Sequence, residues 1–269
     1  MLIVCNGMIR SGSTLQYNIN RSLVELLQVG TGEGYITPDR FADLQEQLVE
    51  WAEDSSVHVI KTHDVPWGII DMAASDAVRV CYIYRDLRDV AASVKSKWRR
   101  QGEALFATLD KAIATYWEVQ AIPVVLCQKY EDIISDVPVA VRALASFLGL
   151  RPTEGIIASV AKECSLESAT KTARSIRLNP FLRVKSMLLR VGRKMQAKRI
   201  LCAIGIKESV LRRIRDSMYY QDKIALLHPD HISENAGAIG KWRKELSDRE
   251  IDTITGRYRS WFLEAGYTI

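Results

Sequence analysis

A glycine- and serine-rich loop stands near the start of the chain, between an apolar run at Leu2–Asn6 and a helical pattern. The loop runs from Gly7 through Arg10-Ser-Gly-Ser-Thr14. Backbone N–H groups of such a loop, the positive end of the helix that follows and the hydroxyl side chains together bind phosphate-like anions. The G-x4-G spacing is that of a nucleotide-binding P-loop, but Ser13 occupies the position of the P-loop lysine. The loop therefore predicts an anion site and disfavours an ordinary ATPase or kinase; a plain strand–helix turn is the alternative.

Two more polar groups follow apolar runs farther along the chain. Val59-Ile-Lys61-Thr-His63 ends one run, and Arg85 ends the run Val78–Tyr84. A histidine is a suitable general base, because its ordinary pKa is about 6.5, and an arginine at a strand end is placed to bind an anion. The alternatives are a histidine that caps the loop after it and a surface arginine that is paired with Asp86 or Asp89.

Taken together, these segments resemble the sulfotransferases that use 3′-phosphoadenosine 5′-phosphosulfate (PAPS). Arg10-Ser-Gly-Ser-Thr14 is similar to the 5′-phosphosulfate loop of that family. Arg85 followed eight residues later by Ser93 resembles its 3′-phosphate motif, and Lys61-Thr-His63 resembles its Lys-Thr-His element. Gly237-Ala-Ile-Gly240-Lys-Trp242 is similar to its C-terminal G-x-x-G-x-W segment, and Tyr130-Glu-Asp132 resembles a further family element.

The resemblance implies a role for each matching residue. His63 is expected to be the general base, with Lys61 and Arg10 as cations on the transferring group and on the bridging oxygen. The transfer is expected to be in line and to need no metal. The expected cofactor-binding residues are Arg10, Ser11, Gly12, Ser13, Thr14, Leu15, Arg85, Ser93, Tyr130, Asn235 and Gly237. The cofactor is expected to be PAPS, with 3′-phosphoadenosine 5′-phosphate (PAP) as the product.

The sequence departs from the family pattern at two places. Leu15 stands where many members have a tryptophan against the adenine, and Asn235-Ala-Gly237 stands where many have Arg-Lys-Gly. Contacts to the adenine and the 3′-phosphate are therefore expected to come partly from elsewhere, with the segment Thr170–Arg174 as one candidate.

Hydrophobic periodicity predicts the elements that must hold these residues. Apolar runs predict strands, and apolar residues at spacings of three and four predict helices. The strands are expected at 2–6, 57–60, 78–84 and 123–127, and the helices at 14–27, 40–53, 86–98, 103–120 and 139–148. This alternation predicts a three-layer α/β/α fold with a mainly parallel central sheet of the P-loop type. We expect one domain over 1–269. It should have an α/β core at 1–150 and a mostly helical portion at 151–269 that completes the cofactor and acceptor sites.

Composition excludes several classes of protein. The chain has 269 residues, of which 48% are hydrophobic and 26% are charged, as in ordinary globular proteins. It has no apolar run long enough to span a membrane and no signal peptide. The five cysteines have no zinc-like spacing and favour a reducing, cytoplasmic setting. His228 and His231 are expected to flank a turn rather than to bind a metal.

The net charge of +5 conceals a strongly basic segment. From Lys171 to Arg215 there are 14 Lys or Arg and one acid, so the rest of the chain is mildly acidic. This segment contains a single aromatic residue, which disfavours binding of single-stranded nucleic acid. It is expected to form a helical hairpin that is solvated or faces the cofactor. Because it mixes apolar and basic residues, contact with a membrane surface is the alternative.

The acceptor is expected to be a small molecule with a hydroxyl or amino group. Glu33, in a predicted loop at Gly30–Tyr35, and Asp64 beside His63 would favour a cationic natural product. A carbohydrate O-sulfotransferase is the main alternative, and a P-loop small-molecule kinase is a further one.

Overall fold

The computed structural model describes residues 1–63, 72–73, 77–171, 226 and 237–269. It divides into two compact units, one formed by Met1–Lys162 with Ala238–Ile269 and the other by Glu163–Gly237. All strands and nearly all helices of the described part belong to the first unit. The prediction of one domain over the whole chain stays a prediction.

A five-stranded parallel sheet forms the centre of the first unit, in the order β2-β3-β1-β4-β5. The strands are β1 (Leu2–Gly7), β2 (Gly30–Tyr35), β3 (Val57–Lys61), β4 (Val78–Tyr84) and β5 (Val125–Lys129). β1 is buried along its whole length, as expected of a central strand covered on both faces. The expected α/β fold with a parallel sheet is thereby confirmed.

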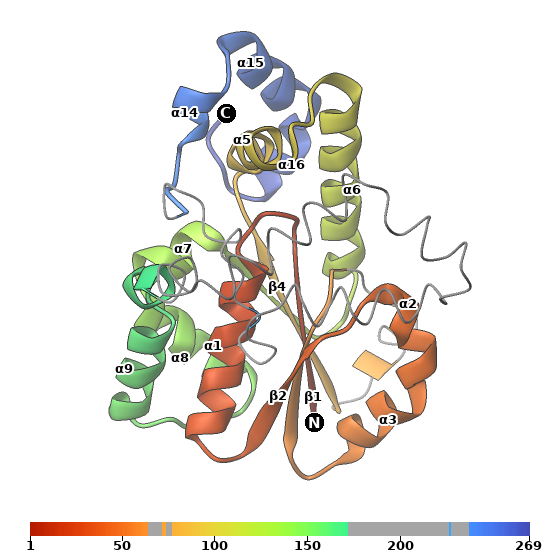
Figure 1. The fold of residues 1–269 in the computed structure, drawn as a ribbon, viewed down its shortest axis with the longest axis vertical. Helices are drawn as coiled ribbons and strands as arrows, with labels where there is room; N and C mark the ends of the chain where they lie inside the picture. The colour runs from red at the N-terminus through yellow and green to blue at the C-terminus, as the bar shows by residue number, and fades with distance from the viewer. Residues whose placement is uncertain (64–71, 74–76, 172–225, 227–236) are drawn as a thin grey trace, which may run out of the picture. The chain divides into compact units, whose positions relative to one another are not determined.

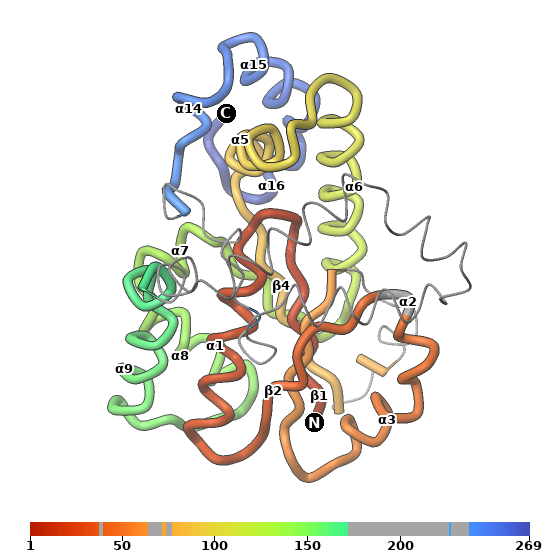
Figure 2. Tube along the Cα trace, in the orientation of Figure 1, coloured from red at the N-terminus to blue at the C-terminus, as the bar shows by residue number. Residues whose placement is uncertain are grey.

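Helices cover both faces of the sheet (Figure 1). The main ones are α1 (Ser13–Leu26), α3 (Gln45–Glu53), α5 (Leu87–Trp98), α6 (Gly102–Gln120), α7 (Tyr130–Ser135), α8 (Val137–Phe147) and α9 (Glu154–Glu163). α1 packs on the strands from one side together with α8, and α3 and α6 lie on the other side. Three short C-terminal helices, α14 (Trp242–Glu245), α15 (Asp248–Arg257) and α16 (Arg259–Glu264), return to pack beside α5 (Figure 2).

Side-chain caps fix the starts of several helices. Asp86 caps α5 by accepting a hydrogen bond from the Arg88 N–H at 2.9 Å. Asp136 caps α8 in the same way, and Ser247 and Glu250 form a capping box at α15. Glu250 also accepts from Lys95 Nζ at 2.7 Å, which ties α15 to α5. The C-terminal helices are therefore held to the helix that follows β4.

Three sequence predictions were wrong in detail. Gly30–Tyr35 is the edge strand β2, not a loop. The predicted helix at 40–53 is divided into α2 (Pro38–Phe41), a 3₁₀ turn (Ala42–Leu44) and α3. The last strand lies two residues later than expected, and the short helix α7 directly after it was not predicted.

The glycines of β2 explain why this strand was missed. A Cβ at Gly30 would overlap the Val57 carbonyl, and a Cβ at Gly32 would lie 2.7 Å from the Tyr17 hydroxyl. These positions need glycine because of close packing, and glycine hides the strand pattern in the sequence.

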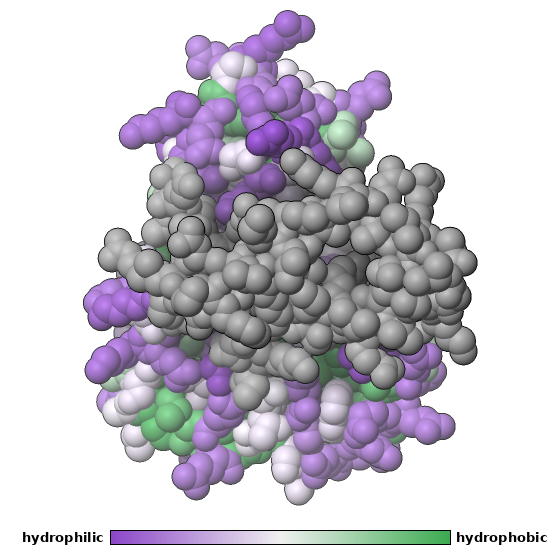
Figure 3. Space-filling view, in the orientation of Figure 1, coloured by the Kyte–Doolittle hydropathy of each residue, from purple (hydrophilic) through white to green (hydrophobic). Residues whose placement is uncertain are grey.

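The described surface in Figure 3 is mostly hydrophilic, with apolar side chains gathered near the lower ends of α1 and α8. None of the helices in the described ranges has the length and apolar character needed to cross a membrane.

Candidate active site

The predicted site residues converge on one edge of the sheet. Parallel pairing places Gly7 beside Ile83, Cys5 beside Lys61 and Tyr84 beside Lys129, so the carboxyl ends of β1, β3, β4 and β5 lie together. Ligands of open α/β sheets bind at this edge. The loop after β1, the Lys61–His63 element, Arg85 and Tyr130 all start from it.

Backbone conformation and buried hydrogen bonds shape the loop after β1. Arg10 and Gly12 have φ angles of 63° and 90°, in the left-handed region. The Ser11 hydroxyl is buried and donates to the carbonyls of Met8 at 2.5 Å and Ile83 at 2.9 Å. Ser11 therefore holds the loop against the end of β4 from within.

The loop leads directly into α1, whose first turn carries Ser13 and Thr14. Gly12 is the N-cap, no side chain caps this helix end, and the Gly12 carbonyl accepts from Leu15 N–H at 2.8 Å. The first N–H groups of a helix have no partner within it and carry a partial positive charge. The loop and helix end are thus a suitable cradle for an anion. Leu15 is half-buried.

The ring of Tyr130 packs on this loop. A Cβ at Gly12 would lie 2.7 Å from Tyr130 Cδ2, so a side chain at position 12 would displace the ring. Tyr130 is buried, and the guanidinium of Arg85 lies over its ring at 4.4 Å. This contact connects the loop after β1 with the residue that follows β4.

A hydrogen bond joins the two predicted anion-binding segments. Arg10 Nε donates to Ser93 Oγ at 2.9 Å, across from the β1 loop to α5. Arg10 was predicted for the phosphosulfate end of the cofactor and Ser93 for its 3′-phosphate end. The two segments are therefore in direct contact.

Arg85 is buried, so the alternative of a surface arginine is wrong. The pairing with Asp89 that this alternative included is present. The side chain is 4% exposed and donates through Nη2 to Asp89 Oδ2 at 3.3 Å and to the Ala238 carbonyl at 2.7 Å. Asp86 pairs instead with Arg88, at 2.7 Å.

Asp89 was not predicted as a site residue, and it holds the C-terminal segment in place. Its fully buried carboxylate accepts from the backbone N–H groups of Gly240 at 2.8 Å and Trp242 at 3.1 Å. The Trp242 ring lies 4.2 Å from the Arg88 guanidinium. The helical spacing of Asp89 from Arg85, four residues, is the only sequence signal for this role.

Lys61 and His63 lie at the end of β3, and Tyr35 at the end of β2 contacts both. Lys61 Nζ is 5.3 Å from the centre of the Tyr35 ring, and the His63 ring is 5.5 Å from it. Lys61 is buried, whereas His63 is exposed. Tyr35 was missed because its strand was expected to be a loop.

Burial lowers the pKa of Lys61 from its usual 10.5 to about 8. The charged form is disfavoured because it loses hydration, and a fall of that size corresponds to about 3 kcal/mol. Lys61 therefore costs stability while it is protonated, which is the expected situation for a cation kept for a function.

Replacing Lys61 with methionine should raise the free energy of unfolding at pH 7 by about 2 kcal/mol. Methionine removes the cost of burying the Lys61 charge, which is about 3 kcal/mol, but also removes the cation–π contact with Tyr35, which is worth ~1 kcal/mol. Because the folded protein binds fewer protons than the unfolded chain between pH 8 and the usual lysine pKa, the gain should shrink as the pH rises through this window. Urea unfolding at pH 7 and 9.5 measures this gain. Lys162→Met, at an exposed position of α9, is the control. A variant less stable than wild type at pH 7 would contradict the prediction.

Glu33 does not stand free beside His63. Its carboxylate Oε1 contacts His58 Nδ1 at 2.9 Å, and the other ring nitrogen of His58 contacts Asp54 Oδ2 at 2.7 Å. The Trp51 ring stacks on His58 at 5.5 Å. Glu33 is therefore engaged with an internal partner, and Asp64 lies outside the described residues.

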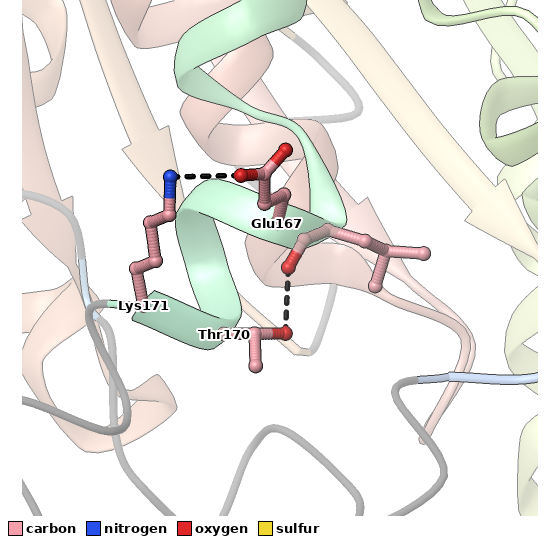
Figure 4. Close-up of a pocket in the computed structure, with 4 residues that line it drawn as sticks. Glu167, Thr170 and Lys171 are labelled. Atoms are coloured by element: carbon pink, nitrogen blue, oxygen red, sulfur yellow. Dashed lines mark hydrogen bonds and ion pairs between the residues drawn. The ribbon is translucent and has the colours of Figure 1, made fainter.

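Other predicted site residues are only partly placed. Asn235, His228, His231 and most of the basic segment lie outside the described residues, and Gly237 is described with a φ of 75°. Figure 4 shows the start of the basic segment, where Lys171 pairs with Glu167 at 2.7 Å and the Thr170 hydroxyl donates to the Leu166 carbonyl at 2.7 Å. Both side chains have partners within their own helix.

No group of three or more His, Cys, Asp or Glu within the described ranges could hold a metal ion. The predicted site residues that carry charge at the strand edge are cations, Arg10, Lys61 and Arg85, and the fully buried carboxylate of Asp89 lies beside Arg85. The arrangement is suited to an anionic ligand.

Comparison with protein-family models finds a match to the family described as "Sulfotransferase domain", over residues 3–180. The match covers more than half of the chain and contains the loop, Lys61, His63, Arg85, Ser93 and Tyr130. A search of curated proteins finds no significant match.

Solved structures with the same fold include mouse sulfotransferase SULT7A1 complexed with PAP. The TM-score is 0.57 and the sequence identity is 14%. The aligned region covers 97% of this chain and 83% of the mouse chain. Retinol dehydratase with retinol and PAP has a TM-score of 0.54 and 16% identity, with 97% and 81% covered. The structure of retinol dehydratase with androsterone and PAP has a TM-score of 0.52 and 16% identity. The aligned region covers 96% of this chain and 79% of that chain. At these identities the likeness shows the fold.

Proposed function

Since this chain belongs to the sulfotransferase domain family, we propose that it transfers the sulfuryl group of PAPS to a hydroxyl or amino group of a small molecule. The observation that carries the proposal is the convergence of an anion-binding loop and a buried arginine at one sheet edge, joined by the Arg10–Ser93 hydrogen bond. PAPS has an anionic group at each end, and this edge offers a cationic group for each. Structures of the same fold contain PAP.

The residues present fit this cofactor. The N–H groups of the loop and of the first turn of α1, with the hydroxyls of Ser13 and Thr14, would hold the 5′-phosphosulfate. Arg85 and Ser93 would hold the 3′-phosphate, and the buried Tyr130 ring would lie against the nucleoside. When bound, PAPS supplies the sulfuryl group and a leaving group that departs as PAP.

His63 would remove the proton of the acceptor as the acceptor oxygen or nitrogen attacks sulfur in line. Its ring is exposed at the end of β3, so an acceptor can reach it. Lys61 and Arg10 would stabilise the charge that develops on the transferred group and on the bridging oxygen. Fixed side-chain cations would thereby perform the role that a metal has in phosphoryl transfer.

The acceptor is proposed to be a small, uncharged alcohol or amine. One of the two carboxylates that favoured a cationic acceptor, Glu33, is engaged with His58, which weakens the case for a cationic natural product. Structures of the same fold hold retinol and androsterone, which are apolar alcohols. Carbohydrate O-sulfation is the alternative, and the cytoplasm is the proposed location. No nucleic-acid partner is proposed.

Thermal-shift titration tests the proposal with PAP, AMP and ATP–Mg²⁺ as ligands. PAP should raise the melting temperature most, because only PAP carries both anionic groups, and AMP should raise it little. Saturation at 100 times Kd stabilises a protein by about 2.7 kcal/mol, which is readily measured. Stabilisation by ATP–Mg²⁺ but not by PAP would overturn the proposal in favour of a kinase.

A further inference from the structure

Lys241 is a half-buried residue near Arg85 that has none of the predicted site roles. It lies between Gly240 and Trp242, whose N–H groups both donate to the Asp89 carboxylate. Its side chain is only 8% exposed. Lysine is rarely buried to this extent unless it is paired.

The pairing of Lys241 is loose. Its ion-pair partner is Glu245, with Nζ and Oε2 separated by 3.6 Å, which is longer than a charged hydrogen bond. Glu245 Oε2 is buried and makes no hydrogen bond to the residues that the structure describes. Burial and the nearby Arg85 charge both lower the pKa of Lys241. Two like charges are thus held close together in a poorly hydrated place.

The charges that act on Lys241 are those of Arg85, Asp89 and Glu245. Of the two carboxylates, only Glu245 is an ion-pair partner of Lys241, at 3.6 Å. Asp89 already accepts from two backbone N–H groups and from Arg85. Burial and the Arg85 charge therefore disfavour the charged form of Lys241 in the folded protein, and an anion that binds between Arg85 and Lys241 would favour it.

We propose that Lys241 binds the 3′-phosphate of the cofactor together with Arg85. This inference rests on the proposed use of PAPS. It also explains a departure in the sequence, since Asn235-Ala-Gly237 has no cation where many relatives have Arg-Lys-Gly. A lysine four residues after Gly237 restores the charge, and Asp89 fixes the backbone on both sides of it.

The test compares Lys241→Met with wild type by calorimetric titration of PAP and AMP. The Kd for PAP should rise about tenfold while that for AMP, which lacks the 3′-phosphate, stays within twofold. Lys241→Arg should recover most of the affinity for PAP. Lys244→Met, at an exposed position of α14, is the control and should change neither Kd.

Each outcome separates this inference from the proposed function. If wild type binds PAP no better than AMP, the proposed cofactor is wrong. If wild type prefers PAP but Lys241→Met binds it with unchanged Kd, the cofactor stands and the role of Lys241 is overturned. Equal losses for PAP and AMP would likewise overturn it, because they would indicate general damage to the site.

Discussion

Replacing His63 with alanine should lower kcat about 10²–10⁴-fold and leave the Kd for PAP within about twofold of wild type. Removal of a general base costs this much because the acceptor must then lose its proton without help. The ring is exposed and packs beside Tyr35 rather than in the core, so the fold should be kept. Single-turnover assays with a phenol or alcohol acceptor, together with PAP titration, measure both quantities.

His58→Ala is the matched control for this prediction. His58 lies within β3, five residues before His63, and contacts Glu33 and Asp54. Its loss should lower stability without lowering kcat comparably. Near wild-type turnover in His63→Ala would show that another group is the base. A large loss of PAP affinity would show that His63 holds the fold of the site instead.

Asp89→Asn should lower the free energy of unfolding by about 3 kcal/mol or more. Breaking a buried ion pair leaves the buried Arg85 charge without compensation, which typically costs about 3–5 kcal/mol. An asparagine amide would also point N–H groups at one of the backbone donors, Gly240 or Trp242. Urea unfolding followed by tryptophan fluorescence gives the difference.

The same variant should bind PAP about tenfold more weakly, because Arg85 loses a partner that orients it. Asp252→Asn, an exposed acid in α15, is the control and should stay within ~0.5 kcal/mol of wild type. A wild-type urea midpoint in Asp89→Asn would refute the role of this carboxylate.

The central strands could be predicted from sequence because burial on both faces produces an unbroken apolar run. β4 was predicted with its observed bounds, 78–84, and β1 and β3 to within one residue. Their C-terminal residues then had to meet at one sheet edge, since parallel strands end on the same side. For this reason Lys61, Arg85 and the loop after β1 could be grouped from the order of apolar runs and polar residues alone.

What the sequence did not reveal depends on contacts between distant residues. The edge strand β2 is rich in glycine because of packing against Val57 and Tyr17, so no periodicity marks it, and Tyr35 was missed with it. Asp89 and Lys241 are separated by about 150 positions, and no local sequence pattern predicts that they lie near each other. The Glu33–His58 contact, likewise, joins neighbouring strands and was not expected.

The Asp89 contacts have a consequence for the order in which this chain acquires its binding site during synthesis. All five strands of the sheet lie within the first 129 residues, so the ribosome releases the sheet early. The partners of Arg85 and Asp89 at Ala238, Gly240 and Trp242 come more than 100 residues later. The same C-terminal segment also supplies Trp242, Trp261 and Phe262 to the hydrophobic core. A nascent chain therefore exposes all five strands before the residues that complete the core and hold Arg85 and Asp89 have been made.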